Sequence, residues 1–337
     1  MIKQSYSFDD LLLVPRYSEI ESRSLVNTNV EINGIIYSQP IIPANMKTVI
    51  SLEMATQLAS NKSLAILHRF MSLEEQLDMV KNLMQFGAEY FAVSVGVLEK
   101  DKSNIGNFYD AGVRIFCIDI AHGDSKHCIE MIKFIKQFAN TTVIAGNVAT
   151  GEGASRLWKA GADIVKVGIG GGSTCLTRVR TANGVAQMSA IMEVYEVKQK
   201  LEKLYNKKYY FISDGGCKEA GDICKALCFA DMVMVGNLFA GTKEAPGNLI
   251  TTNKGFFKEY VGSSTHKSSY VEGVKGMVPY KGDFADVLEE LLEGVRSCCS
   301  YQGVNNLKDL KEDPQFLQIS SSGLKESKAH DIEVFMV

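Results

Sequence analysis

The chain has 337 residues, of which 46% are hydrophobic and 22% are charged, and its formal net charge is −3. This balance excludes the clustered basic surface that duplex nucleic acid or an anionic membrane would need, and six prolines argue against long disordered linkers. The N-terminus has no apolar signal region, and no stretch approaches the roughly 18 consecutive apolar residues of a membrane span. We therefore expect a compact cytoplasmic protein that binds neither nucleic acid nor membranes.

Eight short apolar runs recur along the chain, and each is typical of a parallel strand that is buried on both faces. The runs cover residues 41–44, 64–67, 91–94, 115–119, 143–147, 164–168, 211–214 and 233–236. Amphipathic segments lie between them, at residues 73–86, 125–138 and 185–204. Strict alternation of strands and helices predicts one (β/α)8 TIM barrel over residues 1–337, with a tail at about 319–337 that is either ordered or frayed. The alternative is a doubly wound open sheet with Gly168-Ile169-Gly170 as a dinucleotide fingerprint, but that loop follows the sixth run instead of the first.

Active sites of such barrels form at the carboxyl ends of the strands. The residues expected at those ends are Asn45-Met46, His68-Arg69, Ser94, Asp119, Asn147, Asp214-Gly215-Gly216 and Gly236-Asn237. The glycines after the seventh and eighth runs indicate a phosphate site, and Asp214 in front of them can accept hydrogen bonds from a sugar diol. For Ser94, we expect a turn or a helix cap instead of a site residue.

The loop from Gly168 to Thr177 reads Gly-Ile-Gly-Gly-Gly-Ser-Thr-Cys-Leu-Thr. Its glycines let backbone amides approach an anion, while Cys175 can act as a nucleophile and Thr177 can help to relay a proton. The alternative is an ordinary glycine-rich turn followed by a buried small apolar cysteine. The eight cysteines have no Cys-x-x-Cys spacing, so we expect thiols without zinc, and His122 and His127 flank a predicted turn.

Several ordered motifs resemble the IMP dehydrogenase/GMP reductase family. They are Ala145-Gly146-Asn147-Val148, Gly161-Ala162-Asp163, Lys166-Val167-Gly168-Ile169-Gly170, Ser173-Thr174-Cys175-Leu176-Thr177, Ser213-Asp214-Gly215-Gly216 and Val278-Pro279-Tyr280-Lys281-Gly282. The resemblance runs from Phe8 to about Gly303. It implies a (β/α)8 barrel, usually a homotetramer, that binds a purine 5'-monophosphate and a nicotinamide cofactor.

The resemblance also implies roles for individual residues. Cys175 would bond to purine C2, with Thr177 and Glu272 as its proton relay, although without the family Glu272 would be interpreted as a solvated loop acid. The implied substrate-binding residues are Ser173, Gly216 and Gly236 at the phosphate, Asp214 at the ribose, and Met46, Asn237, Gly262 and Ser263. Asp119, Ala121, Asn147 and Gly168 would line the cofactor side, and the carbonyls of Gly170, Gly172 and Cys175 would ligate a monovalent cation such as K⁺.

Two missing features favour the reductase branch of the family. Leu67-His68-Arg69-Phe70 leads straight into a helix without the regulatory cystathionine-synthase-like (CBS) modules, and residues 265–277 hold no Arg-Tyr pair that could activate water. The resemblance then implies NADPH-dependent deamination of GMP to IMP and ammonia through a covalent Cys175 thioimidate, although the sequence does not fix NADPH against NADH. Two alternatives stay open. One is IMP dehydrogenase, which oxidises IMP to XMP with NAD and which the opening Phe8 to Pro15 resembles; the other is a nucleotide-binding protein without the chemistry.

Overall fold

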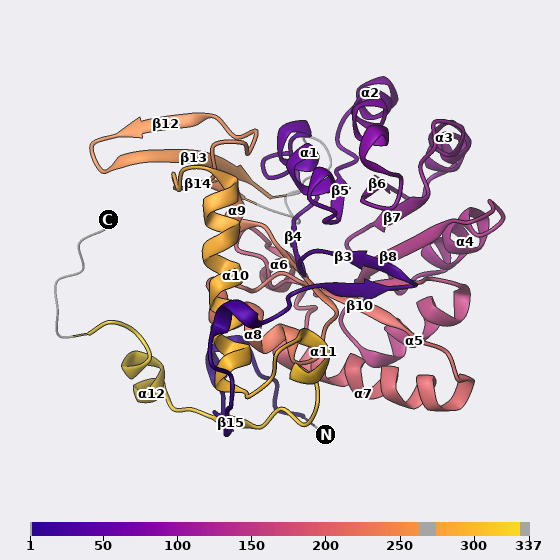
Figure 1. Ribbon diagram of the computed structural model, residues 1–337. Coiled ribbons are helices and arrows are strands. Elements are labelled where there is room, and N and C mark those ends of the chain that lie inside the picture. Colours follow the sequence, from indigo (N-terminus) through magenta and orange to yellow (C-terminus); the bar gives the residue numbers. More distant parts are fainter. Residues whose placement is uncertain (1, 263–273, 331–337) are drawn as a thin grey trace.

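The barrel is built from eight parallel strands in a computed structural model that describes residues 2–262 and 274–330 (Figure 1). The strands are β4 (Ile41–Pro43), β5 (Ala65–Leu67), β6 (Phe91–Val95), β7 (Ile115–Asp119), β8 (Thr142–Val148), β9 (Ile164–Val167), β10 (Tyr210–Asp214) and β11 (Met232–Val235). Each predicted strand is confirmed to within about one residue at its ends, which is the usual uncertainty of strand boundaries.

The strands pair in the order β4-β11-β10-β9-β8-β7-β6-β5. The registers place Ile41 beside Val233 and Ile212 beside Met232, and both pairs are parallel. The first and last strands of this order, β4 and β5, also contact each other, so the sheet curves round into a barrel. The predicted (β/α)8 fold is confirmed, and the open doubly wound alternative is wrong.

Helices follow the strands and form the outer layer of the barrel (Figure 1). They are α1 (Leu52–Ser60), α2 (Leu73–Leu83), α3 (Glu99–Asp110), α4 (Lys126–Ile135), α5 (Gly151–Ala160), α7 (Gln187–Tyr205), α8 (Ala220–Leu227) and α10 (Phe284–Tyr301). Polar caps set several starts: the Ser125 and Thr150 hydroxyls accept amide protons at the first turns of α4 and α5. Ser72 and Glu75 form a reciprocal capping box at the start of α2.

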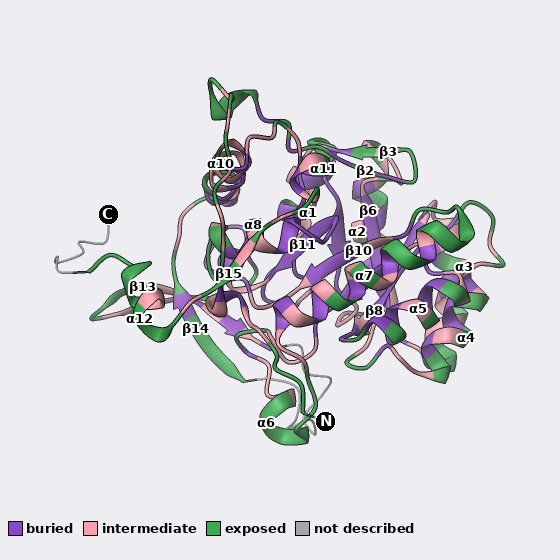
Figure 2. Ribbon diagram, turned by 90° about the horizontal axis from the view of Figure 1, so that it is seen from below, coloured by how far each residue is buried: buried purple, intermediate pink, exposed green. Residues whose placement is uncertain are grey.

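The strands carry the core. In β6, β9 and β11 every residue is buried, as expected for strands covered by side chains inside the barrel and by helices outside (Figure 2). Polar helix faces point to solvent, so the apolar surface is concentrated between the two layers. Within residues 2–262 and 274–330, no helix combines the length and the apolar character that crossing a membrane requires.

Shorter elements decorate the barrel. The antiparallel strands β12 (Leu249–Thr252), β13 (Gly255–Val261) and β14 (Lys275–Pro279) form an arm beside α10 (Figure 1). The remaining elements are η1 (Phe8–Asp10), β1 (Leu11–Leu13), η2 (Arg23–Leu25), β2 (Val30–Ile32), β3 (Ile35–Tyr37), η3 (Met84–Phe86), α6 (Thr177–Thr181), α9 (Asn237–Ala240), α11 (Leu307–Leu310), β15 (Phe316–Gln318) and α12 (Ser321–Glu326). β1 pairs with β15, so the two ends of the barrel domain are tied together, and α12 lies within the predicted tail.

Candidate active site

A cavity of about 350 Å³ opens at the carboxyl ends of the barrel strands, where catalytic residues of this fold gather. It brings together most of the predicted site residues, although they lie far apart in the sequence. Its lining includes Met46, Asp119, Ala121, Asn147, Gly168, Gly170, Gly172, Cys175, Thr177, Asp214 and Gly236. Ser173, Gly216, Asn237 and Gly262 are not among the lining residues, and Ser263 and Glu272 lie outside the described residues.

Cys175 and Thr177 lie next to each other on the wall of this cavity. The loop after β9 carries Cys175, and Thr177 is the first residue of α6. The thiol of Cys175 donates a hydrogen bond of 3.1 Å to Thr177 Oγ1, and the Cys175 amide donates to the Gly172 carbonyl at 3.0 Å. The half-buried Cys175 is therefore held with its sulfur beside a hydroxyl, which is the arrangement that a nucleophile and a proton relay require.

Two glycine segments face each other beside Cys175. A Cβ atom on Gly215 would lie 3.3 Å from the amide nitrogen of Gly172, and one on Gly171 would lie 3.7 Å from that of Gly216. Because neither segment has side chains, their amides can approach one anion together. This geometry is compatible with the predicted phosphate position, which stays a prediction.

Gly168 closes β9 in a conformation that other residues rarely adopt. Its φ is +152°, and a Cβ atom there would lie only 2.0 Å from the carbonyl oxygen of Asp214. We expect Gly168→Ala to lower the free energy of unfolding by about 2–4 kcal/mol and to displace the Cys175 loop. Chemical denaturation of this variant can be compared with that of Gly106→Ala in α3. No atom lies within 4 Å of a Cβ atom at Gly106, so alanine there should leave stability unchanged or raise it. Equal stability of the two variants would contradict this view of the strand end.

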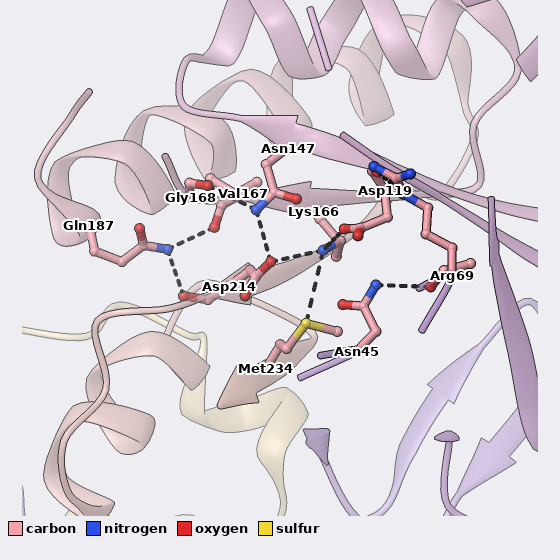
Figure 3. A network of polar contacts seen from close by, with 12 residues as sticks. Asn45, Arg69, Asp119, Asn147, Lys166, Val167, Gly168, Gln187, Asp214 and Met234 are labelled. Carbon is pink, nitrogen blue, oxygen red and sulfur yellow. Dashed lines mark hydrogen bonds and ion pairs between the residues drawn. The ribbon is translucent and has the colours of Figure 1, made fainter. Parts of the chain in front are cut away.

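A buried polar network connects both halves of the cavity (Figure 3). Asn147 Nδ2 donates to the Gly168 carbonyl and to Asp214 Oδ2, each at 2.8 Å. Lys166 Nζ donates to the same Asp214 oxygen at 2.9 Å and to Asp119 Oδ1 at 3.0 Å. The carboxylates at the ends of β7 and β10 are therefore fixed relative to each other.

Asp119 is ionised in spite of its burial. Desolvation alone would raise the pKa of this carboxyl, but the Lys166 ammonium, with help from the Arg69 guanidinium, outweighs it and lowers the pKa. Arg69 also donates from Nε to the Asp119 carbonyl at 3.0 Å. The side of the cavity predicted for the cofactor therefore carries a fixed negative charge.

Four side chains with a place in the site were not predicted as site residues. Lys166 and Thr174 were noted only as parts of motifs, whereas Tyr260 comes from β13, far along the chain. Burial raises the pKa of Tyr260 to about 12, so its hydroxyl keeps its proton at neutral pH.

Gln187, at the start of α7, donates to the Val167 carbonyl at 2.7 Å and to the Ser213 hydroxyl at 3.1 Å. In the sequence, only the amide side chain of Gln187 and its position after the glycine loop could have indicated that it connects β9 to β10.

Ser94 corrects one expectation. It lies inside β6, not in a turn or at a helix cap, and its hydroxyl accepts a hydrogen bond of 2.9 Å from Asn45. The predicted run ended at Ser94, and a serine in that position gave no sign that the strand would continue to Val95. Ser94 therefore positions Asn45, which lines the cavity, through this hydrogen bond.

The loop predicted to ligate a monovalent cation already contacts a cationic side chain. Arg178 donates from Nε and Nη2 to the Ile169 carbonyl, each at 3.2 Å, and from Nη2 to the Val185 carbonyl. The Gly172 carbonyl accepts the Cys175 amide. The carbonyls of Gly170 and Cys175 complete the predicted set, and K⁺ binding by these residues stays a prediction.

Comparison with known proteins assigns the family. The model of the IMP dehydrogenase / GMP reductase domain matches residues 5–330. The chain belongs to the IMP dehydrogenase/GMP reductase family. Within this family it is 39% identical over 317 residues to a GMP reductase of Ligilactobacillus salivarius, with 91% of this chain and 94% of the relative covered. A GMP reductase of Streptococcus agalactiae is 38% identical over 316 residues, covering 91% and 93%.

A solved structure of the same family shares the fold. The chain matches a GMP reductase variant from Trypanosoma brucei in complex with guanosine 5'-monophosphate, with a TM-score of 0.90 and 25% sequence identity. The match covers 98% of this chain and 99% of the other. The predicted family resemblance is thereby confirmed over nearly the whole barrel.

Proposed function

We propose that this protein is a GMP reductase, which converts GMP to IMP and ammonia at the expense of NADPH. The observation that carries the proposal is the Cys175–Thr177 pair, 3.1 Å apart in a cavity that also holds Asp214. The relatives that we compared are named GMP reductases, which favours this activity over the oxidation of IMP to XMP with NAD.

The cavity offers a place for each part of the nucleotide. Asp214 Oδ2 is occupied by Asn147 and Lys166, which leaves Oδ1 for the ribose hydroxyls. The glycine segments at Gly172 and Gly215 support a phosphate position, to which we assign Ser173, Gly216 and Gly236. Met46, Asn237, Gly262 and Ser263 complete the proposed substrate contacts.

The opposite wall suits the nicotinamide end of a cofactor. Asp119, Ala121, Asn147 and Gly168 line the same cavity as Cys175, so a group bound there would reach the purine. NADPH, when bound, supplies a hydride to purine C2. The carboxamide of the nicotinamide can donate hydrogen bonds to the ionised Asp119 carboxylate and to the side-chain oxygen of Asn147.

The reaction can be written in two steps with Cys175 as a covalent catalyst. In the first, Cys175 Sγ bonds to C2 of GMP, the C2–N bond breaks, and the thiol proton passes through Thr177 to the exocyclic amine, which leaves as ammonia. We propose Glu272, which lies outside the described residues, as the second member of this relay. In the second, hydride addition at C2 and cleavage of the C–S bond release IMP and a Cys175 thiolate, which takes up one proton from solvent to restore the thiol.

Removal of the Thr177 hydroxyl should slow ammonia release without abolishing nucleotide binding. We expect Thr177→Val to lower kcat by about a hundredfold to ten-thousandfold, which is the usual contribution of a positioned proton donor. Rapid-quench measurement of ammonia tests this expectation. Thr181→Val is the matched control, because Thr181 lies one helical turn further along α6 and does not line the cavity; its hydroxyl donates to the Thr177 carbonyl and accepts the Asn183 amide. Equal rates for both variants would remove Thr177 from the relay.

The proposed covalent step can be tested from the product side. With IMP and NADP⁺ but no ammonia, the enzyme should form about one equivalent of NADPH and hold the purine on Cys175, which peptide mass spectrometry would detect. Addition of ammonia should then release GMP. Continuous formation of XMP would show instead that water attacks the adduct and that the chain is a dehydrogenase, whereas nucleotide binding without any adduct would favour a binding protein.

We also propose a cytoplasmic homotetramer, on the strength of the family. Light scattering coupled to gel filtration gives the mass in solution, and a monomeric mass would overturn the tetramer.

A further inference from the structure

Lys166 is a buried lysine with two acidic partners. Its side chain is only 2% exposed, and its ammonium lies between Asp119 of β7 and Asp214 of β10, at 3.0 and 2.9 Å (Figure 3). The Met234 sulfur is 4.0 Å away on β11. A lysine this deep is stable as a cation only because carboxylates surround it, and their charges raise its pKa in spite of desolvation.

The other groups around the ammonium do not replace its charge. Burial raises the pKa of Cys117 to about 12, so its thiol is neutral at physiological pH, and the Tyr260 phenol near Asp214 is neutral as well. Asn147 and Asn45 are uncharged. Arg69 is the second cation among the described lining residues, and its hydrogen bond goes to the Asp119 backbone. Asp214 therefore depends on Lys166 for a direct ionic partner.

We propose that Lys166 is a positioning residue that holds the sugar-binding and the cofactor-binding carboxylates through one shared charge. This inference rests on the proposed function, because it takes Asp214 as the ribose ligand and Asp119 as the cofactor-side group. The ammonium fixes Asp214 Oδ2 and turns Oδ1 toward the ribose, while it keeps Asp119 ionised beside the nicotinamide position. Lys166 thus determines the orientation of Asp214 and the ionisation of Asp119, although in this proposal it contacts neither the reacting carbon nor the leaving amine.

Loss of this charge has a predictable pH dependence. Without the ammonium, two partly buried carboxylates face each other and the pKa of the pair should rise, so that one of them takes up a proton toward neutral pH. A protonated Asp214 is a poorer acceptor for the ribose diol. GMP binding should then be weak at low pH and should recover as pH rises and the proton leaves, whereas the wild type, with Lys166 between the two carboxylates, should not show this dependence.

The experiment measures GMP binding by calorimetry from about pH 6 to about pH 9 for wild type and Lys166→Met, with thermal melting as a check of folding. We expect Lys166→Met to bind GMP at least about tenfold more weakly at neutral pH and to regain affinity as pH rises. Lys198→Met is the matched control, because Lys198 is also buried and ion-paired but contacts Asp231, away from the cavity. It should lose stability and keep the affinity and pH profile of the wild type.

A second variant tests the role of Lys166 if Lys166→Met does not fold. Lys166→Met/Asp119→Asn removes one positive and one negative charge, so Asp214 no longer faces a second carboxylate. We expect it to fold and to bind GMP at least about tenfold more weakly than the wild type, because no ammonium fixes Asp214 Oδ2, but without the recovery at high pH. Wild-type affinity and a flat profile in Lys166→Met, or wild-type affinity in the double variant, would overturn the role of Lys166. Failure of the wild type itself to bind GMP would instead overturn the proposed function.

Discussion

Cys175→Ala should abolish turnover of GMP while leaving GMP binding in place. The thiol is the one group in the cavity that is assigned to bond with the purine, and loss of the nucleophile in a covalent mechanism lowers kcat by about a thousandfold or more. The side chain is small and half-buried, so alanine leaves the loop backbone and its glycines unchanged. Steady-state rates and calorimetric GMP affinity, measured on the same preparation, separate the two effects.

Cys298→Ala is the control for this experiment. Cys298 is also half-buried, but it lies on α10, and no part of that helix lines the cavity. We expect wild-type kcat for Cys298→Ala. Residual turnover of Cys175→Ala near that of the control would refute covalent catalysis, and loss of GMP binding in Cys175→Ala would assign the thiol a structural role instead.

Asp231→Asn should give the largest loss of stability among substitutions far from the cavity. Asp231 precedes β11 and accepts hydrogen bonds from Lys198 at 3.0 and 3.1 Å and from Lys311 at 2.5 Å. It also accepts the Phe211 amide at 2.9 Å. Without its charge, the buried Lys198 ammonium and the partly buried Lys311 ammonium lack a counter-ion, and breaking a buried ion pair in this way costs about 3–5 kcal/mol. Chemical denaturation monitored by circular dichroism measures the change.

The same group predicts a specific acid sensitivity. Burial alone would raise the pKa of Asp231, but Lys198 and Lys311 outweigh it and lower the pKa to about 2, from 3.8. The carboxylate therefore contributes stability that is present above about pH 4 and is lost as pH falls through about 2, with a size of about 2–3 kcal/mol. Wild type should lose this stability on acidification, and Asp231→Asn should not.

The surface pair Asp78 and Lys81 provides the comparison for Asp231. Both side chains are largely exposed although they are 2.8 Å apart. Solvent screens such pairs, so Asp78→Asn should leave stability unchanged within error. If Asp231→Asn were as harmless as Asp78→Asn, the buried triad would have no part in joining α7 and α11 to the barrel.

The barrel was predictable because its strands carry a strong local signal. Continuous apolar runs such as residues 164–168 mark a doubly buried strand by themselves. Polar residues at the carboxyl ends of such runs, such as Asp119 and Asp214, lie at the same edge of the sheet once the strands are parallel. The family motifs added Cys175 and Thr177 as partners, and the structure places their side chains in contact. These parts depend only on sequence neighbours and on the fixed direction of the strands.

Other parts of the site depend on distant contacts that leave no local pattern. Lys166 reads as an interruption of an apolar strand, and only the closed barrel shows that it points between two carboxylates. Tyr260 reaches the cavity from the β12–β14 arm, and Ser94 lies inside a strand that was predicted to end at this residue. The pairing of β1 with β15 joins residues about 300 positions apart, a distance at which three-residue strands carry no sequence signal.

The proposed reaction is tested by mixing purified protein with GMP and NADPH and following nicotinamide absorbance together with free ammonia. We expect one ammonia for each NADPH oxidised, and IMP as the nucleotide product. A parallel reaction with IMP and NAD should show no sustained turnover. Steady production of NADH and XMP from IMP, with no ammonia from GMP, would show that the protein is not a GMP reductase. It would also mean that a group outside the usual Arg-Tyr pair activates water.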